Sequence, residues 1–201
     1  MSGKENYGPD DDYELVSRCK RGDLEAFEAL VIKHQKKMLN IAFRMAGNYE
    51  DACEIVQDAF LSAYKGIGNF EKRSRFSTWL YTIVINTSRN RLHQIRSAVR
   101  HEQFSLDDTM TTERGSVSVE LASDCPSAAE QLEKKELQAK VQGCINRLEN
   151  EFREVLVLRD IQGFSYDEIS GMLKIAQGTV KSRLFRAREN MKNCLQKVPG
   201  G

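Results

Sequence analysis

Apolar residues recur every three or four positions along most of the first half of the chain, which is the spacing of one face of an α-helix. The pattern predicts helices over 23–45, 49–66 and 76–96. Asp23 and Asn48 stand at the starts of the first two helices and are residue types that cap a helix N-terminus. We therefore expect the first half to be a small bundle of helices.

The second half continues the same helical spacing and adds a tighter pattern near its end. A helix is expected from about Pro126, and a shorter one over 151–162, followed by a glycine. A serine followed three residues later by a glutamate, a capping box, opens the next helix over 165–173. The last helix begins near Gln177, so that 165–188 is predicted to be a helix-turn-helix.

These elements predict an all-α fold of two small helical domains. The first domain is assigned to residues 12–97 and the second to 126–197. Residues 98–125 are rich in Ser, Thr, Asp and Gly and poor in large apolar residues, so a flexible acidic linker is expected there. Residues 1–11 are expected to be a disordered acidic tail.

Composition narrows the class of protein. Of the 201 residues, 40% are hydrophobic and 29% are charged, which is typical of a globular chain. The chain shows no signal peptide and no apolar run long enough to span a bilayer, so a cytoplasmic protein without membrane insertion is expected. Five widely spaced cysteines without a C-x-x-C pair favour reduced thiols over a disulfide framework or a zinc site. They are Cys19, Cys53, Cys125, Cys144 and Cys194.

Charges are segregated into blocks although the formal net charge is only +1. Residues 72–101 contain seven Lys and Arg residues and no acid, and residues 163–197 contain seven against three acids. Between them, residues 102–124 contain six acids against one arginine. Basic blocks of this kind neutralise phosphates, so nucleic acid is the expected partner, and solvated helix faces are the alternative.

The second helix of the helix-turn-helix carries side chains suited to DNA. In this motif the second helix enters the major groove, where Gln and Arg bond to adenine and guanine edges. A plain surface hairpin of two helices is the alternative. The positions predicted to face outward are Gln177, Gly178, Lys181, Ser182, Phe185, Arg186 and Arg188.

Several segments resemble one family closely. Residues 151–156 (EFREVL), 165–169 (SYDEI) and 178–188 (GTVKSRLFRAR) are similar to region 4 of the bacterial extracytoplasmic-function (ECF) sigma factors. Residues 54–60 (EIVQDAF) and 76–87 (FSTWLYTIVINT) resemble region 2 of the same sigma-70 family. The resemblance covers about 12–97 and 127–195, in the family's order.

The resemblance implies a protein that binds core RNA polymerase, directs it to promoter DNA, and is not itself an enzyme. The residues agree, since no nucleophile–base pair, metal cluster or glycine-rich phosphate loop is evident and no cofactor is expected. His34, His93 and His101 are scattered and are expected at the surface or near DNA. Members of the family are commonly held inactive by an anti-sigma factor, often membrane-bound, so such a partner is expected here.

The resemblance also implies where polymerase binds. Residues at three- and four-residue spacing form a polar, acidic stripe on the helix over 49–66, separate from its apolar stripe. In the family this helix docks on the clamp coiled coil of the β′ subunit, and region 4 binds the β flap. An ordinary solvated face is the alternative. The residues assigned to core polymerase binding are Asp51, Glu54, Gln57, Asp58 and Leu61.

Region 2 is expected to capture an unpaired base of the minus-ten element. Holding separated strands requires contacts that only unpaired bases offer, such as aromatic stacking combined with cations. Phe70 and Phe76 could supply the rings or could equally be core residues, whereas Trp79 is expected in the core. The minus-ten set is Phe70, Lys72, Arg73, Arg75, Phe76, Asn86, Arg89, Asn90 and His93.

Region 4 is expected to bind the minus-thirty-five element as a duplex. The linker would then enter the RNA exit path, or serve as an inert tether. Two other functions remain open: a stand-alone helix-turn-helix regulator with an N-terminal sensing or dimerisation domain, and an RNA-binding adaptor. The minus-thirty-five set is Gln177, Gly178, Thr179, Lys181, Ser182, Arg183, Phe185, Arg186 and Arg188.

Overall fold

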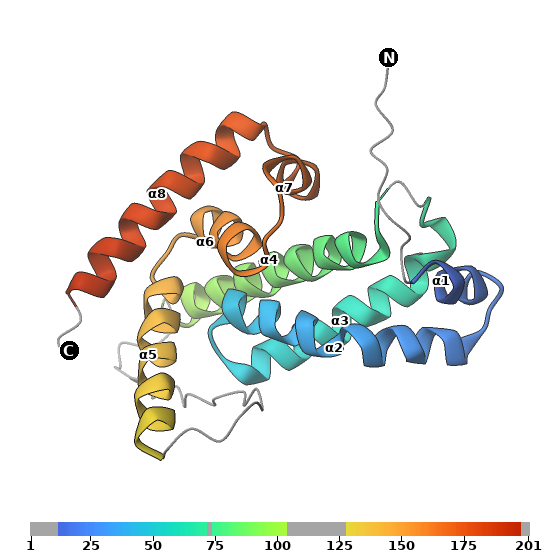
Figure 1. The fold of residues 1–201 in the computed structure, drawn as a ribbon, viewed down its shortest axis with the longest axis horizontal. Helices are drawn as coiled ribbons and strands as arrows, with labels where there is room; N and C mark the ends of the chain where they lie inside the picture. The colour runs from blue at the N-terminus through green and yellow to red at the C-terminus, as the bar shows by residue number, and fades with distance from the viewer. Residues whose placement is uncertain (1–11, 72–73, 104–127, 198–201) are drawn as a thin grey trace.

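The computed structural model describes residues 12–71, 74–103 and 128–197, and within these ranges it contains helices and no strand (Figure 1). The all-α prediction is confirmed. The first half contains α1 (Tyr13–Cys19), α2 (Leu24–Ala46), α3 (Tyr49–Gly66), the 3-10 turn η1 (Ile67–Asn69) and α4 (Phe76–Gln103). The second half contains α5 (Ala128–Asn146), α6 (Asn150–Leu156), the π-helical turn η2 (Val157–Ile161), α7 (Tyr166–Leu173) and α8 (Gln177–Gln196).

Helix ends in the first half follow the capping residues of the sequence. The Asp23 side chain accepts a hydrogen bond from the Ala26 amide at 3.1 Å, and Asn48 accepts one from the Asp51 amide at 2.8 Å. Gly47 ends α2 with φ of +85°, a left-handed conformation that glycine adopts without strain. These contacts confirm the predicted starts of α2 and α3.

The helices α2, α3 and α4 pack into a bundle that buries their apolar stripes, with α1 against α2. Leu30, Met38 and Ile41 of α2 are fully buried, as are Phe76 and Leu80 of α4. Burial of such side chains contributes about 1.5–3 kcal/mol each, which is the main stabilisation of the bundle.

The second half contains the predicted helix-turn-helix. The Ser165 side chain accepts from the Glu168 amide at 3.2 Å, and the Glu168 carboxylate accepts from the Ser165 amide at 2.8 Å, which completes the predicted capping box. Ile169 of α7 and Val180 and Leu184 of α8 are buried in the joint core. The turn between α7 and α8 therefore holds α8 with one side buried and with Lys181, Ser182, Phe185 and Arg186 exposed on the other side.

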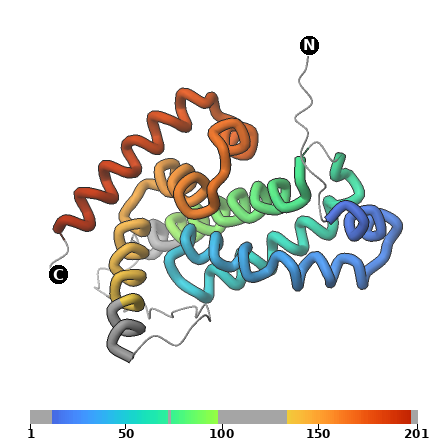
Figure 2. The backbone as a smooth tube through the Cα atoms, viewed as in Figure 1, coloured from blue at the N-terminus to red at the C-terminus, as the bar shows by residue number. Residues whose placement is uncertain are grey.

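The two halves share one hydrophobic core instead of lying apart. Helix α2 contacts α5 and α6, and α4 contacts α7, so the tube of Figure 2 runs as one body through both halves. Sequence alone predicts two domains and a linker but not this contact between them. A Cβ on Gly47 would come within 2.5 Å of the Asn146 side chain, so α2 and α5 meet at close range.

Arg153 joins the helix ends at this contact. Its guanidinium donates to the carbonyl oxygen of Met45 at the end of α2, and to those of Ile145, Asn146 and Leu148 around the end of α5. The last carbonyls of a helix have no partner within the helix, so a buried guanidinium with several donors satisfies them. Burial lowers the pKa of Arg153 from its ordinary value.

Two differences from the sequence predictions concern the middle of the chain and its cysteines. Helix α4 continues through Gln103, so residues 98–103 of the predicted linker are helical, and the rest of the linker and the tail over 1–11 lie outside the described residues. Cys144 and Cys194 form a disulfide, so the prediction of reduced thiols is wrong for this pair. Cys19 is a buried thiol and Cys53 an exposed one, whereas Cys125 lies outside the described residues.

Candidate nucleic-acid and polymerase interfaces

The exposed face of α8 brings most of the predicted minus-thirty-five residues together. Lys181, Ser182, Phe185 and Arg186 are exposed on successive turns, and Phe185 is 69% exposed. Gln177 and Gly178 lie exposed at the start of the helix, as an N-terminal entry into a groove requires. The face combines hydrogen-bonding, cationic and apolar groups, which can recognise base edges, phosphates and a thymine methyl group.

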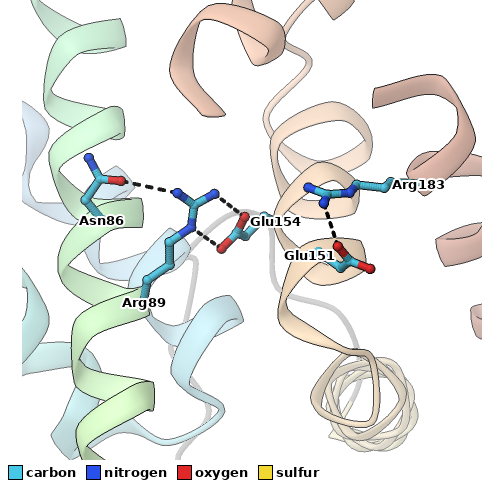
Figure 3. A network of polar contacts seen from close by, with 5 residues as sticks. All are labelled: Asn86, Arg89, Glu151, Glu154 and Arg183. Atoms are coloured by element: carbon cyan, nitrogen blue, oxygen red, sulfur yellow. Dashed lines mark hydrogen bonds and ion pairs between the residues drawn. The ribbon is translucent and has the colours of Figure 1, made fainter. Parts of the chain in front are cut away.

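Several residues of the predicted set have partners within the protein. Ser182 donates to the backbone carbonyl of Thr179 at 3.1 Å, and the Lys181 ammonium lies 5.8 Å from the centre of the Tyr166 ring. The Gln177 amide donates to the Asp167 carboxylate, Arg183 forms an ion pair of 2.5 Å with Glu151, and Arg188 bonds twice to Asp160 at 2.6 and 3.0 Å. The hydrogen bonds to Asp160 raise the pKa of Arg188. Thr179 is half-buried. Arg183 points toward α6 in Figure 3, so it lies on the side of α8 that faces α6 and not on the outer face.

The predicted minus-ten face of α4 is partly engaged by the second half of the chain. Asn86, Asn90 and His93 are exposed at helical spacing. Arg89, between them, binds Glu154 of α6 through two nitrogens, each 2.5 Å from a carboxylate oxygen (Figure 3). A carboxylate thus holds the guanidinium in the paired geometry that a phosphate would use.

Phe70 and Phe76 are core residues. Phe76 is fully buried and Phe70 is 5% exposed, with their ring centroids 6.1 Å apart. The prediction that these rings stack on an unpaired base is therefore wrong for this structure, because their faces are covered by the protein. The half-buried Trp79 packs on both, at 5.0 Å from Phe70 and 5.7 Å from Phe76. Trp79 therefore has the least covered ring of this aromatic cluster.

The loop before α4 is only partly described. Lys72 and Arg73, both assigned to minus-ten binding, lie outside the described residues. Arg75 is exposed next to them. His34, expected at the surface, is buried in α2 and lies 2.8 Å from an oxygen of Asp12. It therefore joins the N-terminal end of α1 to α2 and does not face DNA.

The predicted polymerase-binding stripe on α3 is exposed. Gln57, Asp58 and Leu61 are exposed side by side on the helix surface. Glu54 is paired with Arg91 of α4 at 2.6 Å, and Asp51 with the same guanidinium at 3.0 Å. Asp51 and Glu54, at the N-terminal end of this stripe, are therefore held by ion pairs to Arg91 of α4. Tyr64, also exposed, lies one turn further along α3 and was not among the predicted residues.

Residues at the contact between the halves were also missed. Glu154 is 3% exposed in its side chain and Arg153 is buried beside it, within a run of apolar residues. Tyr81 of α4 packs edge-on against Phe164 at 5.0 Å and donates to Gln162 at 3.2 Å. A charged pair inside an apolar run is the signal that could have marked Arg153 and Glu154 as buried, although it identifies no partner.

No group of three or more His, Cys, Asp and Glu side chains comes together as a metal site in the described ranges of the chain. Within the same ranges, no helix has the length and apolar character to cross a membrane.

Two protein-family models match this chain. A family model described as Sigma-70 region 2 matches residues 30–98, and one described as Sigma-70, region 4 matches residues 138–191. The first match spans α2 to α4 and includes the stripe on α3, and the second spans the helix-turn-helix.

Relatives match over nearly the full length. The chain is 36% identical over 187 residues to the RNA polymerase sigma-H factor of Pseudomonas aeruginosa, covering 92% of this chain and 94% of that protein. It is 33% identical to the ECF RNA polymerase sigma-E factor of Escherichia coli K12, with the same coverage. The fold is similar to that of the sigma factor RpoE of Bartonella quintana, solved with its anti-sigma factor NepR. That match has a TM-score of 0.65 and 24% identity and covers 88% of this chain and 100% of that one. On its two family models and these relatives, the chain belongs to the sigma-70 family of RNA polymerase sigma factors, in the extracytoplasmic-function group.

Proposed function

We propose that this sigma factor divides promoter recognition between its halves, with region 4 reading the minus-thirty-five duplex and region 2 capturing the melted minus-ten strand. The observation that carries the proposal is the face of α8 on which Lys181, Ser182, Phe185 and Arg186 are exposed. A helix presenting this face inserts into a major groove with its N-terminal end first.

In region 4 the proposed contacts fall into two groups. Gln177, Lys181, Ser182, Phe185 and Arg186 are assigned to base edges, because they lie on the exposed face. The residues assigned to phosphates are Thr179, Arg183 and Arg188. Arg183 and Arg188 must exchange carboxylate partners for phosphates, which the bidentate geometry of a guanidinium allows.

In region 2 the proposed set for the minus-ten strand is Arg75, Asn86, Asn90 and His93, with Lys72 and Arg73 outside the described residues. Trp79 replaces Phe70 and Phe76 as the aromatic candidate because its ring is only half-buried. Arg89 joins the set when Glu154 is withdrawn. The two halves must therefore separate before α4 can bind DNA fully.

The partners follow from the same surfaces. The exposed part of α3, at Gln57, Asp58 and Leu61, is proposed to dock on the β′ clamp coiled coil, together with Glu54 and Asp51 once polymerase competes for them. Region 4 is proposed to bind the β flap, and an anti-sigma factor to cover the same faces in the inactive state. The chain is proposed to work in the bacterial cytoplasm without a catalytic reaction of its own.

Transcription with core polymerase on a randomised promoter library, read by sequencing, tests this division. Enrichment of two separated sequence elements is expected, and only when core polymerase is present. A gel shift of the chain alone on the enriched duplex is expected to be negligible. Sequence-specific binding without polymerase would favour a stand-alone regulator instead, and preferential competition by RNA would favour an RNA-binding adaptor.

A further inference from the structure

The disulfide between Cys144 and Cys194 joins α5 to the C-terminal end of α8. The two Cα atoms are 5.8 Å apart, although 50 residues separate them in the sequence. Figure 2 shows this end of α8 beside α5, at the opposite end from the turn that follows α7. The closed loop contains α6, α7 and nearly all of α8, so the bond encloses the whole helix-turn-helix.

Noncovalent contacts hold this end of α8 weakly. Ala187 is its last buried residue, and no side chain from Arg188 to Gln196 is buried. Met191 is partly buried against the core, and the ion pair of Arg188 with Asp160 is exposed. The last two turns of α8 therefore depend on the Cys194 sulfur for a firm attachment, because few buried contacts mean low local stability.

The other end of the disulfide is firmly placed. Cys144 is 2% exposed, and its neighbour Gln142 accepts a hydrogen bond of 2.8 Å from Arg44 of α2. The amide of Gln142 also lies 3.4 Å from the carbonyl oxygens of Phe43 and Arg44. In the free chain α5 is therefore held against α2 of region 2, and the disulfide attaches the C-terminal end of α8, with its few buried contacts, to α5.

The two sulfurs have different surroundings. Cys194 is half-buried, and the Arg147 guanidinium lies 3.7 Å from its sulfur. A cation favours the thiolate, which is the reactive form, whereas the negative end of α8 acts in the opposite direction. The Cys194 sulfur is therefore the accessible one, beside a cation, whereas the Cys144 sulfur is buried and can react only with Cys194.

We propose that Cys144 and Cys194 form a reversible thiol–disulfide pair, which clamps the C-terminal end of α8 to α5 when oxidised and releases it when reduced. The inference rests on the proposed function, because that function places the chain in the cytoplasm, where reductants make protein disulfides transient. Both cysteines lie in the second half of the chain, so the clamp keeps α8 ordered within region 4 and lowers the cost of ordering it on DNA, and the oxidised protein should therefore bind the minus-thirty-five duplex more tightly.

The reaction balances with hydrogen peroxide as the oxidant. The Cys194 thiolate attacks one peroxide oxygen, which gives a sulfenic acid on Cys194 and releases hydroxide that takes up a proton as water. The Cys144 sulfur then displaces the sulfenic oxygen as a second water, and the S–S bond forms with loss of the Cys144 proton. A dithiol reductant reverses the step by thiol–disulfide exchange and is itself oxidised to a disulfide.

The test uses the full chain with Cys53→Ser and Cys125→Ser, which removes the exposed thiol and the one outside the described residues. One sample is oxidised with peroxide, another is reduced with dithiothreitol, and the reagents are removed. Alkylation with N-ethylmaleimide in denaturant should add one label to the oxidised chain, at Cys19, and three to the reduced chain. Hydrogen exchange of the segment 188–196 should be at least about fivefold slower in the oxidised chain, while α2 and α3 are unchanged.

A further Cys194→Ser change gives the matched control, and Cys144→Ala gives a second in case one variant folds poorly. Both should exchange like the reduced chain whatever the oxidant. In transcription with core polymerase, the oxidised chain should bind promoters that contain the minus-thirty-five element at least about fivefold more tightly than the reduced chain. Promoters without that element should show no redox effect.

Three results separate this inference from the proposed function. Three labels after peroxide treatment, or equal exchange of 188–196 in both states, would overturn the thiol–disulfide pair. The expected labels and exchange without any dependence on the minus-thirty-five element would sustain the clamp and overturn the proposed reading of DNA by region 4. Equal promoter affinity in both states, with a clear dependence on that element, would overturn the regulatory part alone.

Discussion

Arg186 is the residue whose environment best matches a base contact. It is exposed on the outer face of α8 and its side chain forms none of the ion pairs found there, unlike Arg183 and Arg188. Its guanidinium is therefore available to a guanine edge without losing an internal partner.

Arg186→Ala should weaken binding of holoenzyme to promoters that contain the minus-thirty-five element by about 1–3 kcal/mol, the range for one lost base contact. Lys192→Ala is the control, because it removes one cation from the same helix outside the proposed face. Quantitative footprinting measures both, and co-purification with core polymerase should be unaffected. Equal losses for the two variants would indicate that only total charge matters.

Unlike Arg186, the acidic residue Glu54 of α3 already has a partner within the protein. The ion pair with Arg91 is at the surface, where such pairs contribute about 0–1 kcal/mol, so a polymerase cation can compete for the carboxylate. Asp58 is exposed on the next turn.

The double change Glu54→Ala with Asp58→Ala should abolish co-purification with core polymerase and leave the thermal midpoint within a few degrees of the parent. Glu14→Ala with Glu28→Ala removes the same charge from exposed positions of α1 and α2 and should bind normally. Undiminished association of the first double variant in a pull-down would remove the proposed docking surface.

Between elements, the contact of α4 with α6 depends on an ion pair whose two side chains are buried to very different extents. Glu154 is 3% exposed in its side chain, whereas Arg89 is 36% exposed. Removing Arg89 leaves a buried carboxylate without its cation, but removing the charge of Glu154 leaves a guanidinium that water can reach. The hydrogen bonds between Arg89 and Glu154 raise the pKa of Arg89, which agrees with a favourable contact in the folded chain.

Arg89→Ala should therefore lower the free energy of unfolding by about 2–3 kcal/mol, below the 3–5 kcal/mol of a fully buried pair because Arg89 is partly solvated. Glu154→Gln keeps an oxygen acceptor and should cost about 1 kcal/mol. Denaturant unfolding of the two variants measures the difference. A larger loss for Glu154→Gln would contradict the assignment of the buried charge to Glu154.

The disulfide between α5 and α8 makes a separate contribution to the stability of region 4. A bond that closes a loop of about 50 residues stabilises a fold by about 2–4 kcal/mol, mainly by restricting the unfolded chain. Reduction, or Cys194→Ser, should lower the free energy of unfolding of region 4 by that amount, measured by chemical denaturation. An unchanged midpoint after complete reduction would show that noncovalent contacts alone hold α8.

The helices could be predicted from the sequence because local signals determine them. Asp23, Asn48 and Ser165 start helices through contacts three residues away, and Gly47 ends one through its own backbone freedom. The Cys144–Cys194 bond could not be predicted, since it joins residues 50 positions apart that meet only after folding. The pairing of Arg89 with Glu154 is likewise set by tertiary packing and not by local sequence.

In the candidate site, too, some features follow from local sequence and others only from tertiary packing. The exposed face of α8 follows directly from helical spacing, because Val180 and Leu184 fix which side is buried. Phe70 and Phe76 could not be placed by spacing alone, since an aromatic residue after a glycine-rich loop is compatible with both a core and a stacking surface. Their burial against Trp79 is a property of the assembled bundle.

At the scale of the molecule, the shared core places both proposed DNA faces in one compact body. Promoter elements lie at separate positions along a duplex, and Arg89 of region 2 is bound to Glu154 of region 4. On the proposed function, the free chain is in a closed arrangement, and core polymerase is expected to supply the differential binding energy that separates the halves.

A distance measurement between the halves tests this separation. Fluorophores on Glu28→Cys in α2 and Lys192→Cys in α8, with Cys53 and Cys125 replaced by serine and the disulfide intact, should show strong energy transfer in the free chain. Core polymerase and promoter should reduce the transfer, and Glu154→Gln should reduce it partly without them, because the charge that holds Arg89 is gone. A pair on Glu28→Cys and Lys65→Cys, both within region 2, should stay constant. Constant transfer between α2 and α8 in a transcribing complex would mean that the closed arrangement itself binds the promoter.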